Sequence, residues 1–441
     1  MNLLYFILVA LSLYGDMVKR YIPAQAALST LYGSSVAILI WLILNRTHQK
    51  RLKLIRNQES DLLCKSIYFI SIIYIFHFLL GSNNAPFLAG LTYLLYIFIP
   101  LFYSVVVIKC CPDFNITKFS NIYHLLMIPI NIIGLIQYKI NPNFFIDKTY
   151  ASSGGIIKRN LFENGHFLRL PSIFVSADRY SAIGLIQFYL AFFLLLNQKQ
   201  NKPVNIFWIL FNFISGFIAM FISGARSRLI IVIAVLIIFT LTIIKGLLSG
   251  YSFNWLTNFK YSFKKIFTTI LVLGLMLIFI LLYYPEILNG LINEINSFPI
   301  VTFLQDSFTT GDVEDRVNVT IARSLVPDDI PWFGTGIGSF GDRPGEYSLA
   351  QTWAESGIFW GFFKLIGFIG IMFAMLLKAF QAFVVNDSVK VAAFTLPTLA
   401  ILTGLLTGLA GVLELSSGVM LAVAVGAIMQ YDNQSKINNR L

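Results

Sequence analysis

Apolar runs of about 20 residues recur from one end of the chain to the other, and they constrain the fold more than any other feature. A helix of roughly that length crosses the hydrocarbon core of a bilayer, which is about 30 Å thick. Hydrophobic residues make up 57% of the chain and charged residues 12%, as in helical membrane proteins rather than soluble domains. We therefore expect an all-α polytopic membrane protein in which residues 1–441 form a single integral domain.

The apolar pattern predicts about twelve transmembrane helices. They cover residues 2–16, 26–45, 64–82, 87–108, 121–138, 178–196, 204–222, 229–248, 265–284, 356–378, 390–408 and 411–430. The first run has neither a basic leading segment nor a clear small-residue cleavage site, so we expect a retained helix rather than a signal peptide. Two longer segments, residues 139–178 and 285–355, form large loops, and loops of this size outside a bundle usually carry function.

The distribution of charge predicts the orientation. Placing the amino terminus in the cytoplasm puts the basic connectors at residues 48–56, 109–118, 199–202 and 260–265 on the inner side, together with both termini. The two large loops then face outward. The net charge of +11 follows from the excess of lysine and arginine on the inner side, which orients the chain in the membrane. No basic stripe interleaved with aromatic residues is present, so nucleic-acid binding is not expected.

Arginine is concentrated in the outer segments, whereas lysine supplies most of the inner cations. The clearest example is the turn Ser-Gly-Ala-Arg-Ser-Arg at residues 223–228, where Arg226 and Arg228 lie between two apolar runs. A guanidinium fork binds phosphate or carboxylate in a bidentate manner, which favours a multivalent anion as the ligand. The alternative is that these arginines pair with outer acidic residues or reach lipid phosphates.

The cysteines and histidines predict no metal or cofactor site. Cys64, Cys110 and Cys111 fall at inner ends of expected helices, which leaves no disulfide framework outside and no metal-ligand spacing. His77 and His124 lie within expected helices, where we expect each to make a hydrogen bond. The chain is therefore expected to use neither a metal nor an organic cofactor.

The second large loop contains the most specific pattern. Arg316 opens an expected helix, and the string Pro-Trp-Phe-Gly-Thr-Gly-Ile-Gly-Ser-Phe follows at residues 331–340. Its three glycines, two positions apart, predict a close backbone approach or unusual dihedral angles. Glu346 and Glu355 come next, and Glu355 stands two residues before Gly357 and the following apolar run.

Together these pieces resemble the bacterial O-antigen polymerase and O-antigen ligase superfamily of lipid-linked oligosaccharide transferases. The matching elements occur in the family's order over about residues 165–380: Ser-Gly-Ala-Arg before a membrane helix, an arginine opening a loop helix, Pro-x-Phe-Gly-x-Gly-x-Gly-x-Phe, and Glu-x-Gly. The resemblance implies a fold similar to the glycosyltransferase-C class. It also implies transfer of a glycan from an undecaprenyl pyrophosphate donor to a sugar hydroxyl, on the periplasmic face of a bacterial inner membrane.

Carried over by position, the resemblance assigns the donor pyrophosphate to Arg226 and Arg316, with Arg228, Arg169 and Arg343 in support. Fixed cations can stabilise the charge that develops on a pyrophosphate leaving group without a metal. The expected partners are the undecaprenyl-pyrophosphate-linked donor and acceptor and the membrane lipids, and a chain-length regulator is compatible with this function.

Ligases of the superfamily carry a His-Asn pair about nine residues before the glutamate of Glu-x-Gly, where this chain has Glu346 and Tyr347. The absence of that histidine favours polymerisation of repeat units over transfer to lipid A core. A carboxylate, Glu346 or else Glu355, would then take the proton of the acceptor hydroxyl. The competing acids are Asp178, Asp315 and Asp342.

Two other functions stay open: an O-antigen ligase, and a lipid-linked oligosaccharide flippase or other secondary transporter. Transporters commonly contain related halves and helices broken at the midplane. No similarity between the halves is evident here, and few charges lie deep in the expected helices, Lys364 and Glu414 being the two assigned to the membrane rather than to either side. Because the polar residues concentrate in the outer loops, we favour chemistry at the membrane surface over translocation.

Overall fold

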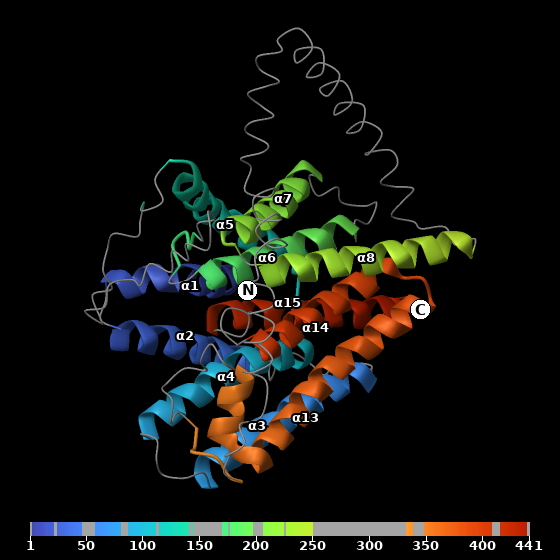
Figure 1. The fold of residues 1–441 in the computed structure, drawn as a ribbon. Coiled ribbons are helices and arrows are strands. Elements are labelled where there is room, and N and C mark those ends of the chain that lie inside the picture. Colours follow the sequence, from blue (N-terminus) through green and yellow to red (C-terminus); the bar gives the residue numbers. More distant parts are fainter. Residues whose placement is uncertain are drawn as a thin grey trace, which may run out of the picture.

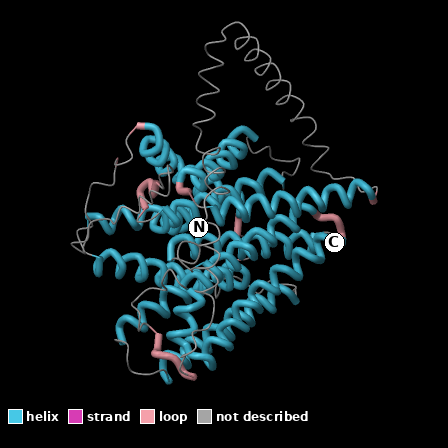
Figure 2. The backbone as a smooth tube through the Cα atoms, in the orientation of Figure 1, coloured by secondary structure: helices cyan, strands magenta, loops and turns pink. Residues whose placement is uncertain are grey.

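The computed structural model describes residues 2–21, 24–45, 58–80, 87–111, 114–140, 144, 170–174, 177–196, 206–224, 226–249, 332–337, 348–407 and 415–438. Within these residues the regular secondary structure is helical throughout, as Figure 2 shows. The helices are α1 (Asn2–Tyr21), α2 (Ala24–Asn45), α3 (Gln58–Leu80), α4 (Phe87–Cys110), α5 (Ile116–Lys139), α6 (Ala177–Leu196), α7 (Ile206–Ile222), α8 (Arg226–Leu248), α13 (Ser348–Val384), α14 (Ser388–Thr407) and α15 (Leu415–Asn438). Six of them are long and apolar enough to cross a membrane, and the others contain shorter apolar stretches, so the chain has the make-up of a polytopic membrane protein.

Each described helix overlaps one of the expected apolar runs, which confirms the helical fold class. The expected helix at residues 265–284 lies outside the described residues, as do most of both large loops. α13 begins at Ser348 rather than at residue 356, so the last residues assigned to the second loop are helical. The apolar pattern missed this start because the segment before Gly357 mixes polar and apolar residues.

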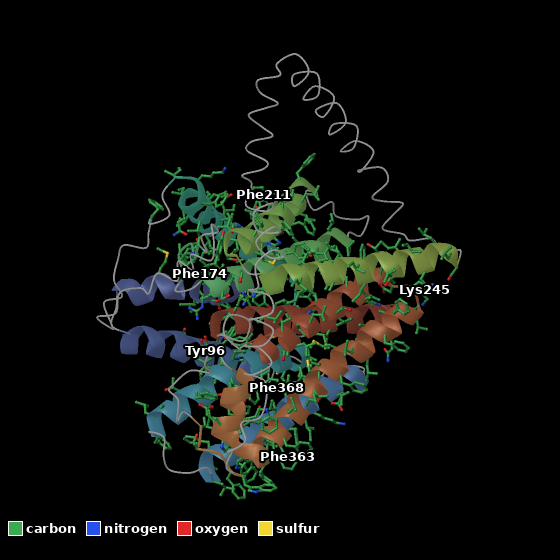
Figure 3. The ribbon with its side chains drawn as sticks, viewed as in Figure 1. Tyr96, Phe174, Phe211, Lys245, Phe363 and Phe368 are labelled. Atoms are coloured by element: carbon green, nitrogen blue, oxygen red, sulfur yellow. The ribbon has the colours of Figure 1, made fainter. Side chains whose placement is uncertain are left out.

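One face of α8 is an apolar stripe that suits contact with lipid. Its large side chains are roughly half exposed or more and recur at intervals of three and four residues: Ile230, Ile233, Ile237, Leu241, Ile244 and Leu248. Phe211 on α7 is 51% exposed as well and lies towards the outside of the bundle in Figure 3. Apolar surface of this extent is uncommon on a soluble monomer, and lipid tails solvate it readily.

α6 lies at the centre of the bundle, and nearly every one of its residues is buried. It packs closely on α7, because a Cβ on Gly216 would lie 2.6 Å from the Phe188 nitrogen and 2.8 Å from the Gly184 oxygen. Small residues at such a crossing let two helix backbones approach each other. Tyr189 joins α6 to α14 by donating a 2.6 Å hydrogen bond to the carbonyl of Ala393.

α13 runs antiparallel to α3, and the two helices are in close contact. Gly367 packs on Ile70, and Gly370 packs on Ser66, so rising residue numbers on α13 meet falling numbers on α3. The first turns of α13 therefore lie beside the carboxyl end of α3.

The carboxyl ends of α8 and α13 meet each other. The Lys245 ammonium of α8 donates a 2.6 Å hydrogen bond to the carbonyl of Phe383 on α13. Both helices run away from this contact towards their first turns (Figure 1). The amino-terminal ends of α8 and α13, which carry Arg226 and Glu355, consequently both lie away from this contact, and the two helices diverge towards them (Figure 1).

Candidate functional site

The arginine turn connects α7 to α8. α7 closes with a hydrogen bond from the Ser223 nitrogen to the carbonyl of Ala219, and Gly224 has a φ of 65°, in the left-handed region that glycine adopts without strain. The nitrogen of Leu170 donates to the carbonyl of Ile222 at 3.3 Å. The short segment 170–174 therefore lies against the end of α7, next to the turn.

Arg228, in the first turn of α8, is anchored to α6. Its side chain is 5% exposed, and Nη1 lies 3.6 Å from Oδ1 of Asp178 and donates a hydrogen bond to the hydroxyl of Ser181. The Asp178 side chain is about half exposed, which weakens the ion pair through solvent screening. Arg228 therefore pairs with an acidic residue, as in the alternative interpretation, and the acid comes from another helix rather than from the turn.

Two helix amino termini meet at this place, since Asp178 lies in the first turn of α6 and Arg228 in the first turn of α8. Helix amino termini carry a partial positive charge, so an arginine in a first turn is electrostatically unfavourable and an anion is favourable. The first turn of α8 contains no acidic residue. The turn is thus suited to an anion that approaches from outside the helix.

A second site lies at a break in α13. Gly357 has φ 64° and ψ −178° inside the helix, which interrupts its ladder of hydrogen bonds. The turn 332–337 provides replacement partners: the nitrogens of Thr335 and Gly336 donate to the carbonyls of Ala354 and Glu355, each at 3.0 Å. The carbonyl of Trp332 in turn accepts from the nitrogen of Phe359 at 3.0 Å. The glycine-rich string of the second loop is therefore docked on the break.

Gly334 makes this docking possible. Its φ is 73°, and a Cβ at this position would lie 2.2 Å from the oxygen of Glu355 and 2.4 Å from the nitrogen of Gly357. Real Cβ atoms do not come so close to backbone atoms, so a side chain would displace the turn. The close backbone approach expected from the glycine spacing is confirmed at Gly334.

The break carries a buried cluster of charged and polar side chains, which we call the kink cluster: Glu355, Ser356 and Lys364 of α13, His77 and Tyr74 of α3, and Tyr93 of α4. All are at most 2% exposed. The Lys364 ammonium lies 2.9 Å from His77 Nδ1, donates to the Ser356 hydroxyl at 2.6 Å, and is 4.2 Å from the centre of the Tyr74 ring. The hydrogen bond expected for His77 is confirmed, and its partner is the lysine.

Glu355 is the acidic member of the kink cluster. Its carboxylate accepts a hydrogen bond from Tyr93 and interacts electrostatically with Lys364. Next to it, the His77 ring stacks on Trp360 with ring centres 5.6 Å apart. Among the described residues, the buried Trp360 Nε1 has no hydrogen-bond partner, and the His77 ring has the backbone carbonyl of Glu355 nearby, although His77 Nε2 makes no hydrogen bond of normal geometry. Buried donors of this kind normally bind a protein group, a water molecule or a ligand.

Most of the residues predicted for the site lie outside the described part of the chain. These are Arg169, Arg316, Arg343 and Glu346, together with the side chain of Arg226. Whether Arg226 and Arg316 meet in space stays a prediction. Of the described candidates, Arg228 belongs to the arginine turn and Glu355 to the kink cluster.

No role in the site was predicted for the other members of the kink cluster: Tyr74, His77, Tyr93, Ser356 and Lys364. One signal was present: Lys364 lies in an apolar run, and a charge there normally has a partner and often a function. The partner could not be read from the sequence, because His77 precedes Lys364 by 287 positions.

Among the described residues, no group of three or more His, Cys, Asp and Glu side chains could hold a metal ion. In comparisons with known proteins, no protein-family model and no curated protein matches the chain. The features that indicate a function are therefore the arginine turn, the kink cluster and the order of the sequence motifs.

Proposed function

We propose that the chain is a metal-independent glycosyltransferase that polymerises undecaprenyl-pyrophosphate-linked oligosaccharide repeat units into O-antigen or a similar surface polysaccharide. One observation carries the proposal. The Pro-x-Phe-Gly-x-Gly string and the Glu-x-Gly element, two separate parts of the family pattern, are joined by a backbone hydrogen bond from the Gly336 nitrogen to the Glu355 carbonyl. A chance match of two short motifs would not require them to be in contact.

The arginine turn supports the same proposal. It lies at the amino-terminal end of α8, the kink cluster lies at the amino-terminal end of α13, and the two helices meet at their other ends through Lys245 and Phe383. An anion site and a carboxylate site are what transfer from a pyrophosphate lipid requires. The proposed reaction takes place on the periplasmic face of the inner membrane, and the proposed topology has both termini in the cytoplasm.

In the proposed reaction, Arg226 and Arg316 bind the pyrophosphate of the lipid that carries the growing chain, with Arg169, Arg228 and Arg343 in support. A carboxylate, Glu346 or Glu355, takes the proton of the acceptor hydroxyl on an incoming repeat unit. The hydroxyl oxygen forms a bond to the anomeric carbon while the bond from that carbon to the pyrophosphate oxygen breaks. The leaving pyrophosphate keeps the electron pair, and the cations stabilise its charge.

Reconstitution with a single substrate tests the function. The purified protein in liposomes, supplied only with an undecaprenyl-pyrophosphate-linked repeat unit, should produce a ladder of longer lipid-linked glycans. If no ladder forms, but glycan is transferred when lipid A core is added, the protein is a ligase and the polymerase proposal is wrong.

A transporter is the second candidate, because the kink cluster places Lys364, Glu355 and His77 within two candidate membrane spans, Trp353–Val384 and Asp61–Leu80. Buried ionisable groups in transporters bind protons or substrates. The same liposomes distinguish this function: a transporter would move the intact lipid-linked unit to the other leaflet without lengthening it.

The native cysteines test the orientation. Cys64 and Cys111 are buried, whereas Cys110 is partly exposed. Burial raises the pKa of the Cys111 thiol to about 12, with Cys110 adding to the shift. A membrane-impermeant maleimide should label Cys110 only after the cells are permeabilised. A cysteine introduced at Ile140, which is 77% exposed at the end of α5, should be labelled in intact cells. The reverse result would invert the proposed topology.

A further inference from the structure

The kink cluster contains two ionisable side chains at positions where burying a charge has a high free-energy cost. Glu355 and Lys364 are both 1% exposed, and both belong to the candidate span Trp353–Val384. A buried charge in such a place needs a counter-charge and hydrogen bonds, and an ionisable residue within a membrane segment marks a functional site more often than one at the surface. The partners of Glu355 and Lys364 therefore show whether the cluster stabilises the charged or the neutral form of each side chain.

The partners of Lys364 all stabilise its ammonium form. His77 Nδ1 and the Ser356 hydroxyl accept its protons, and the negative face of the Tyr74 ring lies 4.2 Å away. A charged Lys364 can only donate in this contact, so His77 Nδ1 then accepts and the proton of the neutral imidazole lies on Nε2. In both hydrogen bonds the partner of Lys364 acts as the acceptor.

The partners of Glu355 stabilise its carboxylate in the same way. Tyr93 from α4 donates a hydrogen bond to it, and Lys364 supplies the opposite charge. The groups that interact with Glu355 thus come from α3, α4 and α13: Tyr74, Tyr93 and Lys364 interact with its charge, and His77 with its backbone carbonyl. Tyr74 and His77 are neutral members of this set, and Lys364 is its cation.

We propose that Lys364 is a positioning residue, held by His77 and Ser356, which keeps Glu355 ionised at the Gly357 break so that its carboxylate can accept the proton of a sugar hydroxyl. The inference deepens the proposed function and rests on it. It also selects Glu355 over Glu346 as the base. In the reaction, the proton passes from the acceptor hydroxyl to a Glu355 oxygen while the hydroxyl oxygen bonds to the anomeric carbon and the pyrophosphate leaves.

The surroundings of the carboxylate suit this role. Trp360 Nε1 is buried and lacks a partner among the described residues, so the break retains a hydrogen-bond donor that a polyhydroxylated ligand can use. Exclusion of water strengthens every electrostatic interaction inside such a site. The low exposure of Glu355 is compatible with catalysis, because productive contacts of an acid or base often form only when substrate is bound.

Infrared spectroscopy tests the charge state without any assumption about the reaction. The difference between the spectra of the wild-type protein and Glu355→Gln isolates the bands of Glu355. We expect carboxylate bands at neutral pH in the wild type, and the carbonyl stretch of a protonated acid after Lys364→Met. A protonated Glu355 in the wild type, or no change after Lys364→Met, would overturn the proposal.

Activity and thermal unfolding of a double variant separate positioning from a purely structural role. Lys364→Met should slow chain extension at least tenfold and lower the unfolding temperature, and Glu355→Gln should slow extension about 100-fold or more. Glu355→Gln combined with Lys364→Met should recover the unfolding temperature but not the activity, because the buried charges are removed together. Lys65→Met, which removes an exposed lysine, should change neither quantity. Recovery of activity in the double variant would show that the pair is only structural. A wild-type protein that makes no polymer would instead contradict the proposed function, and the infrared result would then decide the charge state of Glu355 by itself.

Discussion

Replacing Gly334 by alanine should displace the turn 332–337 from α13 and reduce the stability of the folded protein by roughly 3 kcal/mol. The new Cβ would lie 2.2 Å from the Glu355 oxygen and 2.4 Å from the Gly357 nitrogen, and the clashing atoms belong to the backbone, which cannot rotate away. The φ of 73° adds strain for any residue with a side chain. Thermal unfolding in detergent measures the loss.

Polymer formation should fall in the same variant, because the turn supplies hydrogen bonds to Ala354 and Glu355 beside the proposed base. Gly33→Ala is the matched control: nothing lies within 4 Å of a Cβ at Gly33, which is inside α2. We expect that control to be neutral or more stable by at most about 1 kcal/mol. Equal unfolding temperatures for the two variants would show that the turn does not hold the break in α13.

Replacing Arg226 by lysine should reduce polymer formation about 100-fold or more while leaving the unfolding temperature unchanged. The substitution keeps the positive charge and removes the planar fork that binds a pyrophosphate through two parallel hydrogen bonds. The expected loss is therefore in transition-state stabilisation rather than in folding. The measurement is the rate of ladder formation in liposomes, together with thermal unfolding of the same preparation.

Arg228→Lys is the informative comparison for this prediction. Arg228 contacts Asp178 and Ser181 on α6, so its replacement should lower the unfolding temperature and the activity together. Undiminished polymer from Arg226→Lys would exclude bidentate binding at that position. An Arg228→Lys variant that loses activity with no loss of stability would transfer the role of donor-binding residue to Arg228.

The helices themselves could be predicted from the sequence because a helix in lipid satisfies its backbone hydrogen bonds within one segment. Hydropathy therefore locates α4, α5 and α6 to within a few residues. The start of α13 was missed, since its first turns carry polar residues and precede the break at Gly357. The same local reasoning predicted a close approach at the glycine string, and Gly334 confirms it.

The partners of the charged residues could not be predicted in this way. The sequence identified Arg228 as an unusual charge, and only the packing of α8 on α6 shows that Asp178 and Ser181 hold it. Lys364 likewise has a partner, His77, on a helix that is distant in sequence. The positions of Arg316 and Glu346 relative to these groups stay predictions.

The sequence by itself determined that the chain folds into apolar helices, where most of them lie, and which short motifs interrupt them. The tertiary structure decided which motifs are in contact: the turn 332–337 with the break at Gly357, and the amino end of α8 with that of α6. The physical reason is the range of the interactions. Backbone hydrogen bonds and transfer into lipid act within a single segment, whereas ion pairs and close backbone contacts depend on how helix surfaces from distant segments pack together.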